Sequence, residues 1–383
     1  MRIIYLIMGN GLSSQLGGSI IRSINIMKNL SAKPNVEISV ITTSGGKRAC
    51  LNEGLKAEFL EIPCSIVSRT EKSGFDRFLA YLISTLSFPF FINRIKQYDV
   101  LYTDSDFFCD VIPAVYLRTF YPKTKWTAMI HHSMKVSKQN AKEWLRSGML
   151  VTFQLLSFQL IRRFADGVFV YDTDMGRKIS NYFTGKRIFR VWNGYDEETI
   201  HRINAKRLKN AFSACYLGGI RPSKGMFEII PIWKRVVRKN CKASLIVVGA
   251  GVSENISWFK DEIKKNGLSK NITFIGGKPN AESLSLLSQS KLLFLPSLEE
   301  GWGITVCEAA ALNRQAVVYN LPAFDKFSWV EKIQLKNHKS FAQKTLKGIS
   351  STRINRFDRL VQQYSWRSIA NNELKIFKEL TNK

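Results

Sequence analysis

Short runs of apolar residues alternate along the chain with longer segments in which apolar and polar residues mix at helical spacing. Short, nearly uninterrupted apolar runs are typical of strands buried on both faces of a parallel sheet. In the first half such runs lie at 2–8, 36–43, 100–103, 126–131, 167–171 and 188–192. The pattern restarts in the second half at 212–217, 243–249, 271–275, 291–295 and 315–319. The sequence therefore predicts an α/β protein with two doubly wound parallel sheets.

A turn followed by charged residues, Asn-Gly-Tyr-Asp-Glu-Glu at 193–198, separates the two series of runs. We therefore predict one Rossmann-like domain at 1–193 and a second at 194–364. Doubly wound domains bind ligands at the carboxyl ends of their strands. Two of them in tandem are expected to face a common cleft.

The segment FLPSLEEGWGITVCEAAALN, residues 294–313, carries the most specific chemical pattern. It reads as an apolar strand, a loop with two glycines, and a helix that begins near Ile304. A glycine at Gly303 lets the backbone turn tightly and approach a ligand. The free amides of Gly303, Ile304 and Thr305, with the positive end of the helix dipole, predict an anion site suited to a diphosphate.

Two carboxylates, Glu300 and Glu308, flank this anion site. A carboxylate close to a phosphate is repulsive unless it faces a hydroxyl, so the pair predicts a ligand with both phosphates and sugar hydroxyls. The Glu-(seven residues)-Glu spacing and the Gly-aromatic-Gly insert resemble the signature of retaining glycosyltransferases of the GT-B fold, in particular glycosyltransferase family 4 (glycosyl transferases group 1). The resemblance implies that Glu300 holds the transferred sugar and that Glu308 holds the ribose of the donor. The alternative is an ordinary loop-to-helix junction with a solvated Glu308.

A second glycine-rich turn, YLGGIRPSKG at 216–225, ends a strand and opens a helix. Its two cations, Arg221 and Lys224, are suited to neutralising a diphosphate leaving group. Many members of the resembling family carry an arginine at the position of Gly219, whereas this chain places Arg221 later, before the proline. The alternative is a basic cap on a surface helix.

Three further segments gain their interpretation from the resemblance. Gly17 and Gly18 end a strand-to-helix loop in the first half, where their amides are expected to contact phosphate, sugar or acceptor. His131 ends an apolar run, and the resemblance implies that a histidine here lines the cleft beside the sugar. Gly277 and Lys278 lie where backbone groups of the family contact the nucleobase.

Asp104-Ser105-Asp106 and Asp172-Thr173-Asp174 each spell Asp-X-Asp, the metal motif of the other major glycosyltransferase fold. Both follow strands in the first half, away from the predicted donor site, and are interpreted as loop or helix-start carboxylates. Six cysteines without a Cys-X-X-Cys pair favour reduced thiols over disulfides or zinc. The resemblance implies that no metal and no cofactor is required and that the donor substrate is a nucleotide sugar such as a UDP- or GDP-sugar.

The formal net charge is +27 at pH 7, which is typical of proteins that bind nucleic acid, an acidic membrane surface or anionic substrates. Residues 1–195 hold 26 Lys/Arg against 14 Asp/Glu, and residues 196–383 hold 31 against 16, so the excess is spread over both halves. No nucleic-acid-binding motif is present, and paired carboxylates would repel a phosphate backbone. We expect no nucleic-acid partner. A basic nucleic-acid-binding protein, a nucleotide-sugar epimerase, a phosphorylase and a non-catalytic sugar-nucleotide regulator stay open as alternatives.

Residues 123–146 hold six basic side chains against Glu143 alone, and apolar helix-forming sequence follows to about 164. This combination suits the face of an acidic bilayer, and therefore a lipid-linked acceptor. The alternative is a solvated basic face over a normal core helix. No segment is apolar for long enough to predict a membrane span. We expect a cytoplasmic protein, peripheral at the inner face of the cell membrane.

A Tyr-Ser-Trp triplet before the last predicted helix resembles the C-terminal segment of the same family. The resemblance implies that the helix at 365–383 packs back on the first domain. The complete prediction is a retaining, metal-independent hexosyltransferase that transfers a sugar to an alcohol of a lipid-linked or cell-surface glycan.

Overall fold

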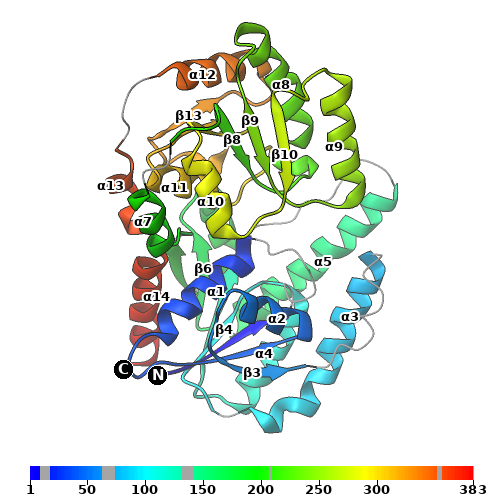
Figure 1. Ribbon diagram of the computed structural model, residues 1–383. Helices are drawn as coiled ribbons and strands as arrows, with labels where there is room; N and C mark the ends of the chain where they lie inside the picture. The colour runs from blue at the N-terminus through cyan, green and yellow to red at the C-terminus, as the bar shows by residue number, and fades with distance from the viewer. Residues whose placement is uncertain are drawn as a thin grey trace. The chain divides into compact units, whose positions relative to one another are not determined.

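A computed structural model describes seven stretches of the chain, namely 1–8, 18–62, 74–95, 97–131, 141–206, 209–351 and 356–382. The chain divides into two compact units, which are coloured along the chain in Figure 1. Unit 1 comprises Met1–Trp192 and Ile369–Lys383, and unit 2 comprises Asn193–Ser368.

Unit 1 is built on a seven-stranded, fully parallel sheet in the order β3-β2-β1-β4-β5-β6-β7. Its strands are β1 (Arg2–Ile7), β2 (Glu37–Thr42), β3 (Glu58–Glu61), β4 (Val100–Thr103), β5 (Lys125–Ile130), β6 (Gly167–Tyr171) and β7 (Arg187–Val191). Its helices are α1 (Gly18–Ser31), α2 (Ser44–Asn52), α3 (Gly74–Ser87), the 3-10 helix η2 (Phe88–Arg94), α4 (Phe108–Phe120), α5 (Ala141–Phe164), α6 (Asp174–Ser180), the 3-10 helix η3 (Asn181–Phe183) and most of α14 (Trp366–Thr381).

Unit 2 is built on a six-stranded, fully parallel sheet in the order β10-β9-β8-β11-β12-β13. Its strands are β8 (Ala214–Leu217), β9 (Leu245–Val248), β10 (Ile272–Gly276), β11 (Leu292–Leu295), β12 (Gln315–Tyr319) and β13 (Val330–Ile333). Its helices are α7 (Glu197–Ala205), η4 (Pro222–Lys224), α8 (Met226–Lys239), α9 (Ser253–Lys265), α10 (Asn280–Ser288), α11 (Ile304–Ala311), η5 (Pro322–Phe324), α12 (His338–Ser350), α13 (Asp358–Val361) and η6 (Gln362–Tyr364).

The central strands are buried on both faces because they are apolar at successive positions. β9 (Leu-Ile-Val-Val) and β11 (Leu-Leu-Phe-Leu) are buried throughout, and five of the six residues of β1 are buried. Helices cover both sides, as a parallel sheet requires. Each half is therefore the predicted doubly wound α/β sheet. Two edge strands, β3 (Glu-Phe-Leu-Glu) and β13 (Val-Glu-Lys-Ile), were not predicted because both are short and half polar.

The last helix, α14, contributes to the core of unit 1. The ring of Phe377 lies 6.1 Å from that of Tyr102 and 5.9 Å from that of Phe169, measured between centroids. Glu373 forms a fully buried ion pair with Arg22 of α1. Unit 1 is therefore assembled from the first and last parts of the chain.

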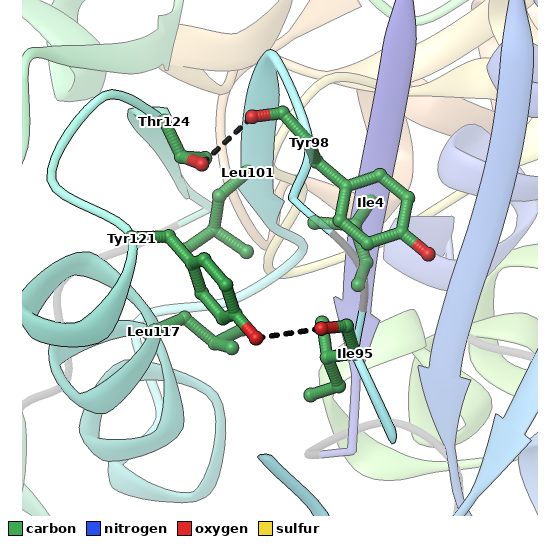
Figure 2. A pocket seen from close by; sticks show the side chains of 7 residues that line it. All are labelled: Ile4, Ile95, Tyr98, Leu101, Leu117, Tyr121 and Thr124. Atoms are coloured by element: carbon green, nitrogen blue, oxygen red, sulfur yellow. Dashed lines mark hydrogen bonds between the residues drawn. The ribbon is translucent and has the colours of Figure 1, made fainter. Parts of the chain in front are cut away.

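A small void in unit 1, shown in Figure 2, has a volume of about 10 Å³. The hydroxyl of Tyr121 donates to the carbonyl of Ile95 at 2.6 Å, and that of Thr124 donates to the carbonyl of Tyr98 at 2.7 Å. A void of this size has room for about one water molecule, so it is no substrate site. Within the described residues, every helix is too short or too polar to cross a membrane.

Candidate functional site

The candidate site of unit 2 lies where its strand order changes direction. β8 is flanked by β9 on one side and by β11 on the other, so the loops that follow β8 and β11 lead to opposite faces of the sheet. The point where such loops part is the usual ligand-binding crevice of a doubly wound sheet. The two segments singled out in the sequence, 216–225 and 294–313, contain these two loops.

The two loops are held tightly against each other. Gly225 adopts φ +74°, and a Cβ at this position would lie 1.9 Å from the carbonyl oxygen of Pro296. The amides of Leu298 and Glu299 both donate to the carbonyl of Ser223 at 3.0 Å. Only glycine fits between the loops at position 225, which fixes the start of α8 against the end of β11.

Lys224 and Glu300 meet directly. The Lys224 Nζ lies 2.7 Å from a Glu300 carboxylate oxygen and 3.5 Å from the carbonyl oxygen of Glu299. The two side chains are 19% and 8% exposed, so the pair is largely shielded from solvent. The hydroxyl of Tyr216 lies 3.0 Å from the carbonyl oxygens of both Gly219 and Lys224, which braces the turn that carries the lysine. The structure thus brings the predicted cation and the predicted sugar-holding carboxylate into contact.

The start of α11 is formed by Gly303 at φ +88°. A Cβ here would lie 2.5 Å from the ring of Phe324, so both backbone geometry and packing require glycine. The preceding Trp302 is buried, and its ring lies 5.4 Å from that of Phe327, which anchors the loop to the core. The first amides of a helix have no partner within it, and the described residues place no acceptor at those of Ile304 or Thr305. The predicted anion site therefore has free donors.

Glu308 lies just over one turn into α11 and is 6% exposed. Burial, followed by the charge of Asp196, raises the pKa of Glu308 to about 7. No hydrogen bond to this carboxylate is among the causes of the shift. An ionised carboxylate without donors is unfavourable in a buried place. Donors from a ligand, such as a pair of hydroxyls, would satisfy it.

The contacts of the other predicted donor residues do not assign them a role. Arg221 is exposed and precedes η4. Lys278 is engaged with Glu282 in an ion pair of 3.0 Å. Gly277 follows β10, and a Cβ there would lie 3.0 Å from that of Ala250, so the loops after β9 and β10 also converge. These residues lie at the carboxyl edge of the sheet, and their roles stay predictions.

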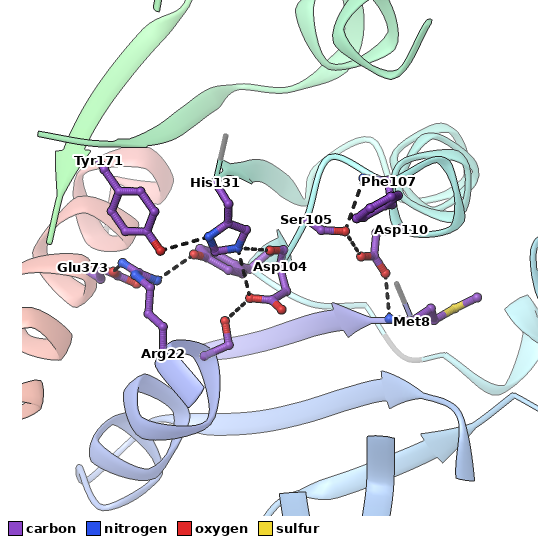
Figure 3. Close-up of polar contacts among 11 residues, drawn as sticks. Met8, Arg22, Asp104, Ser105, Phe107, Asp110, His131, Tyr171 and Glu373 are labelled. Carbon is purple, nitrogen blue, oxygen red and sulfur yellow. Dashed lines mark hydrogen bonds and ion pairs between the residues drawn. The ribbon is translucent and has the colours of Figure 1, made fainter. Parts of the chain in front are cut away.

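His131, at the end of β5 in unit 1, uses both ring nitrogens within the protein (Figure 3). Its Nε2 lies 2.6 Å from the carbonyl oxygen of Asp104, and its Nδ1 lies 2.9 Å from the hydroxyl of Tyr171. A carbonyl oxygen only accepts, so Nε2 donates its hydrogen to Asp104, while Nδ1 faces a Tyr171 hydroxyl that can donate or accept. The two contacts therefore fix the orientation of the ring, which suits a positioning role.

The carboxylates of Asp104 and Asp106 are buried and engaged inside unit 1. Ser23 donates to Asp104, and the Gln154 amide donates to Asp106 at 2.6 Å. In the second Asp-X-Asp segment, Thr173 caps α6 by accepting from the Gly176 amide. No group of three or more His, Cys, Asp or Glu residues in the described chain is arranged to hold a metal ion.

Of the predicted acceptor loop, Gly18 begins α1 and is exposed, whereas Gly17 lies outside the described residues.

Two contributors were missed in the sequence. Asp196 caps α7 by accepting from the Thr199 amide at 3.1 Å and also influences Glu308. Tyr216 supports the Lys224 turn. An Asp followed by two Glu in the first turn is a recognisable helix start, but nothing in the sequence relates it to Glu308. The Tyr of YLGG carries no such signal, because an aromatic residue at the end of a buried strand reads as core.

Comparison with known proteins agrees with this geometry. Residues 196–327 match the family model of Glycosyl transferases group 1. An uncharacterized glycosyltransferase of Methanocaldococcus jannaschii is 25% identical over 232 residues, which are 58% of this chain and 55% of that protein. The chain thus spans about half the length of this curated relative.

Two solved structures share the fold over nearly their whole length. Sucrose-phosphate synthase from Thermosynechococcus elongatus has a TM-score of 0.75 at 14% identity, over 100% of this chain and 99% of that one. HepE of Anabaena, in complex with UDP and glucose, has a TM-score of 0.70 at 15% identity, over 99% and 100%. The fold is that of the GT-B glycosyltransferases. The match to Glycosyl transferases group 1 covers residues 196–327, which lie within unit 2.

Proposed function

We propose that the protein is a retaining glycosyltransferase that moves a sugar from a nucleotide-sugar donor to an alcohol acceptor. The observation that carries the proposal is the shielded Lys224–Glu300 pair in the loop leading to the free amides of α11. This arrangement offers a cation and amides to a diphosphate, and a carboxylate to sugar hydroxyls.

In this proposal the nucleotide-sugar donor binds to unit 2. Lys224, Arg221 and the amides of Ile304 and Thr305 hold the diphosphate, and the buried Glu308 accepts from the ribose hydroxyls. Backbone groups at 276–279 contact the base. HepE, which shares the fold, holds UDP, so we expect UDP-sugars to bind ahead of GDP-sugars.

Breaking the bond to the anomeric carbon leaves negative charge on the diphosphate. Lys224 and the amides stabilise that charge where it develops. Because Lys224 already lies against Glu300, donor binding needs only a small change, in which the lysine meets phosphate and the carboxylate meets sugar. The acceptor hydroxyl attacks on the leaving-group side and gives its proton to the departing phosphate. No general base is required, and His131, with both ring nitrogens engaged, positions the sugar.

The acceptor belongs to unit 1, with the loop of Gly17 and Gly18 beside it. We propose an alcohol of a lipid-linked or cell-surface glycan, met at the inner face of the cell membrane. Because Lys224, Arg221 and the amides supply positive charge, we propose that no metal ion or cofactor takes part.

Nucleotide binding tests the donor site. UDP at a hundredfold excess over its Kd should raise the Tm of the wild type by roughly 5 °C. Lys224→Ala should abolish the rise, because the diphosphate loses its cation. The matched control is Lys344→Ala, which breaks a comparable ion pair to Glu331 (2.9 Å) on α12. An equal rise in all three proteins would refute the site.

Product analysis then separates transfer from its rivals. An epimerised free donor, or turnover driven by a sugar phosphate, would identify a related enzyme instead. Salt-sensitive binding of DNA without any nucleotide response would identify a nucleic-acid-binding protein.

A further inference from the structure

Helix α5 carries an apolar stripe on its outward side. The side chains of Trp144, Leu145, Met149, Leu155 and Leu156 are 58%, 60%, 47%, 46% and 56% exposed, and these five residues are termed the α5 stripe. Because an α-helix turns about 100° per residue, they fall on one side, and the stripe extends over the first half of the helix and beyond its middle.

The opposite side of α5 faces the core. Phe158 and Ile161 are buried there among the residues that cover the unit 1 sheet, and Gln154 and Ser157 are buried beside them. A surface helix normally carries polar residues on its outward side. Of the side chains that the structure describes from 144 to 160, only Thr152 and Gln159 are exposed polar residues among the five large apolar side chains of the stripe, so this side has more apolar surface than a solvated helix face normally carries.

The neighbouring surface is apolar and basic. α4 packs against α5 and exposes Tyr116 and Phe120. Arg162 and Arg163 are exposed on the same side of α5 as the stripe, and Lys123 is exposed just after α4. Over the side chains described from 81 to 131 and from 144 to 164 there is no exposed acidic residue, since all four carboxylates there are buried or half-buried: Asp99, Asp104, Asp106 and Asp110.

We propose that the α5 stripe is a membrane-docking surface, lying in the headgroup region of an acidic bilayer with Arg162 and Arg163 on anionic lipid. Apolar side chains beside cations without intervening carboxylates match that boundary in both polarity and charge. A second copy of this chain fits less well, because a twofold contact sets identical patches face to face, and the described part of this patch holds no exposed carboxylate to pair with the arginines. The inference does not depend on the proposed glycosyl transfer.

Vesicle co-flotation tests the proposal with the full-length protein and without any nucleotide. The probes are vesicles of phosphatidylcholine with phosphatidylglycerol, and vesicles of phosphatidylcholine alone. The wild type should float with the acidic vesicles only. Leu155→Gln/Leu156→Gln should weaken binding about tenfold or more, because two half-exposed leucines no longer enter the apolar boundary. Arg162→Gln/Arg163→Gln should also weaken it about tenfold or more, from the loss of two charges near the surface.

The matched control is Leu335→Gln/Leu360→Gln in unit 2, where the side chains are 47% and 48% exposed. It should float like the wild type, and circular dichroism should show all variants folded. Absence of flotation, or equal flotation of the α5 variant and the control, overturns the proposal. A wild-type dimer that the α5 variant converts to a monomer, without vesicle binding, overturns it in favour of self-association.

Discussion

Glu308→Gln should make the fold more stable and the donor site weaker, and the gain in stability should depend on pH. The carboxylate is 6% exposed, and its pKa is raised from 4.5 to about 7 by burial and by Asp196. Glutamine has nearly the same shape and carries no charge. The substitution therefore removes the unfavourable ionised form and leaves the packing of α11 in place.

The magnitude follows from the difference between the two pKa values. At about 1.4 kcal/mol per pKa unit, ionising Glu308 in the folded state costs about 3 kcal/mol relative to the unfolded chain. The folded state keeps its proton between pH 4.5 and about 7 while the unfolded chain has lost it, so wild-type stability from this group falls as pH rises through that window. The free energy of unfolding of Glu308→Gln should match that of the wild type near pH 4.5. Above about pH 7 it should exceed the wild-type value by up to about 3 kcal/mol.

Urea unfolding followed by tryptophan fluorescence, at about pH 5 and about pH 8, measures the difference. Glu299→Gln, an exposed carboxylate of the same loop, serves as the control and should change little at either pH. A gain in stability of Glu308→Gln that is equal at both pH values, or a loss of stability at about pH 8, would refute the reasoning. At about pH 8 and without urea, UDP should bind the variant about tenfold more weakly, because hydroxyls donate more strongly to a charged acceptor. Wild-type affinity should rise as pH passes about 7.

Three other predictions concern backbone, core and metal. Gly303→Ala should lower stability by about 1–2 kcal/mol or more and reduce UDP binding, because φ is +88° and Phe324 occupies the Cβ position; Gly301→Ala, with nothing within 4 Å, is the control in the same thermal-shift assay. Arg22→Met should destabilise by about 3–5 kcal/mol because Glu373 is left buried and unpaired, whereas the double variant Arg22→Met/Glu373→Met should recover much of the loss in urea unfolding. A double variant that loses as much stability as Arg22→Met and Glu373→Met together would contradict this. Turnover should survive EDTA, and strict dependence on added manganese would return attention to the Asp-X-Asp segments.

Periodicity sufficed to predict both sheets because their strands are uninterrupted apolar runs. The edge strand β13, Val-Glu-Lys-Ile, was missed because an edge position needs only half of its side chains buried. The ion pair between Lys224 and Glu300 joined two residues singled out separately, since loops after neighbouring parallel strands leave the same edge. The contact itself depends on the close approach at Gly225, which no local pattern reveals.

Other features of the site follow from contacts distant in sequence. The orientation of the His131 ring depends on the carbonyl of Asp104 and on Tyr171, which belong to two different strand ends. The burial of Glu308 had a partial signal, because its neighbours in α11 are small and apolar and six of the eight helix residues are buried. Its raised pKa also needs Asp196, more than a hundred positions earlier, and this coupling is not encoded in spacing.

The ion pair of Arg22 and Glu373 joins residues 351 positions apart, and it fixes the order in which the polypeptide can mature on the ribosome. The segment that makes up unit 2 is translated between these two partners. While unit 2 emerges from the ribosome, the guanidinium of Arg22 lies in the interior of the nascent amino-terminal unit without the carboxylate of Glu373. Unit 2, whose whole sheet is local in the chain, is free to fold first, and the amino-terminal unit reaches its final packing only after translation has passed residue 373.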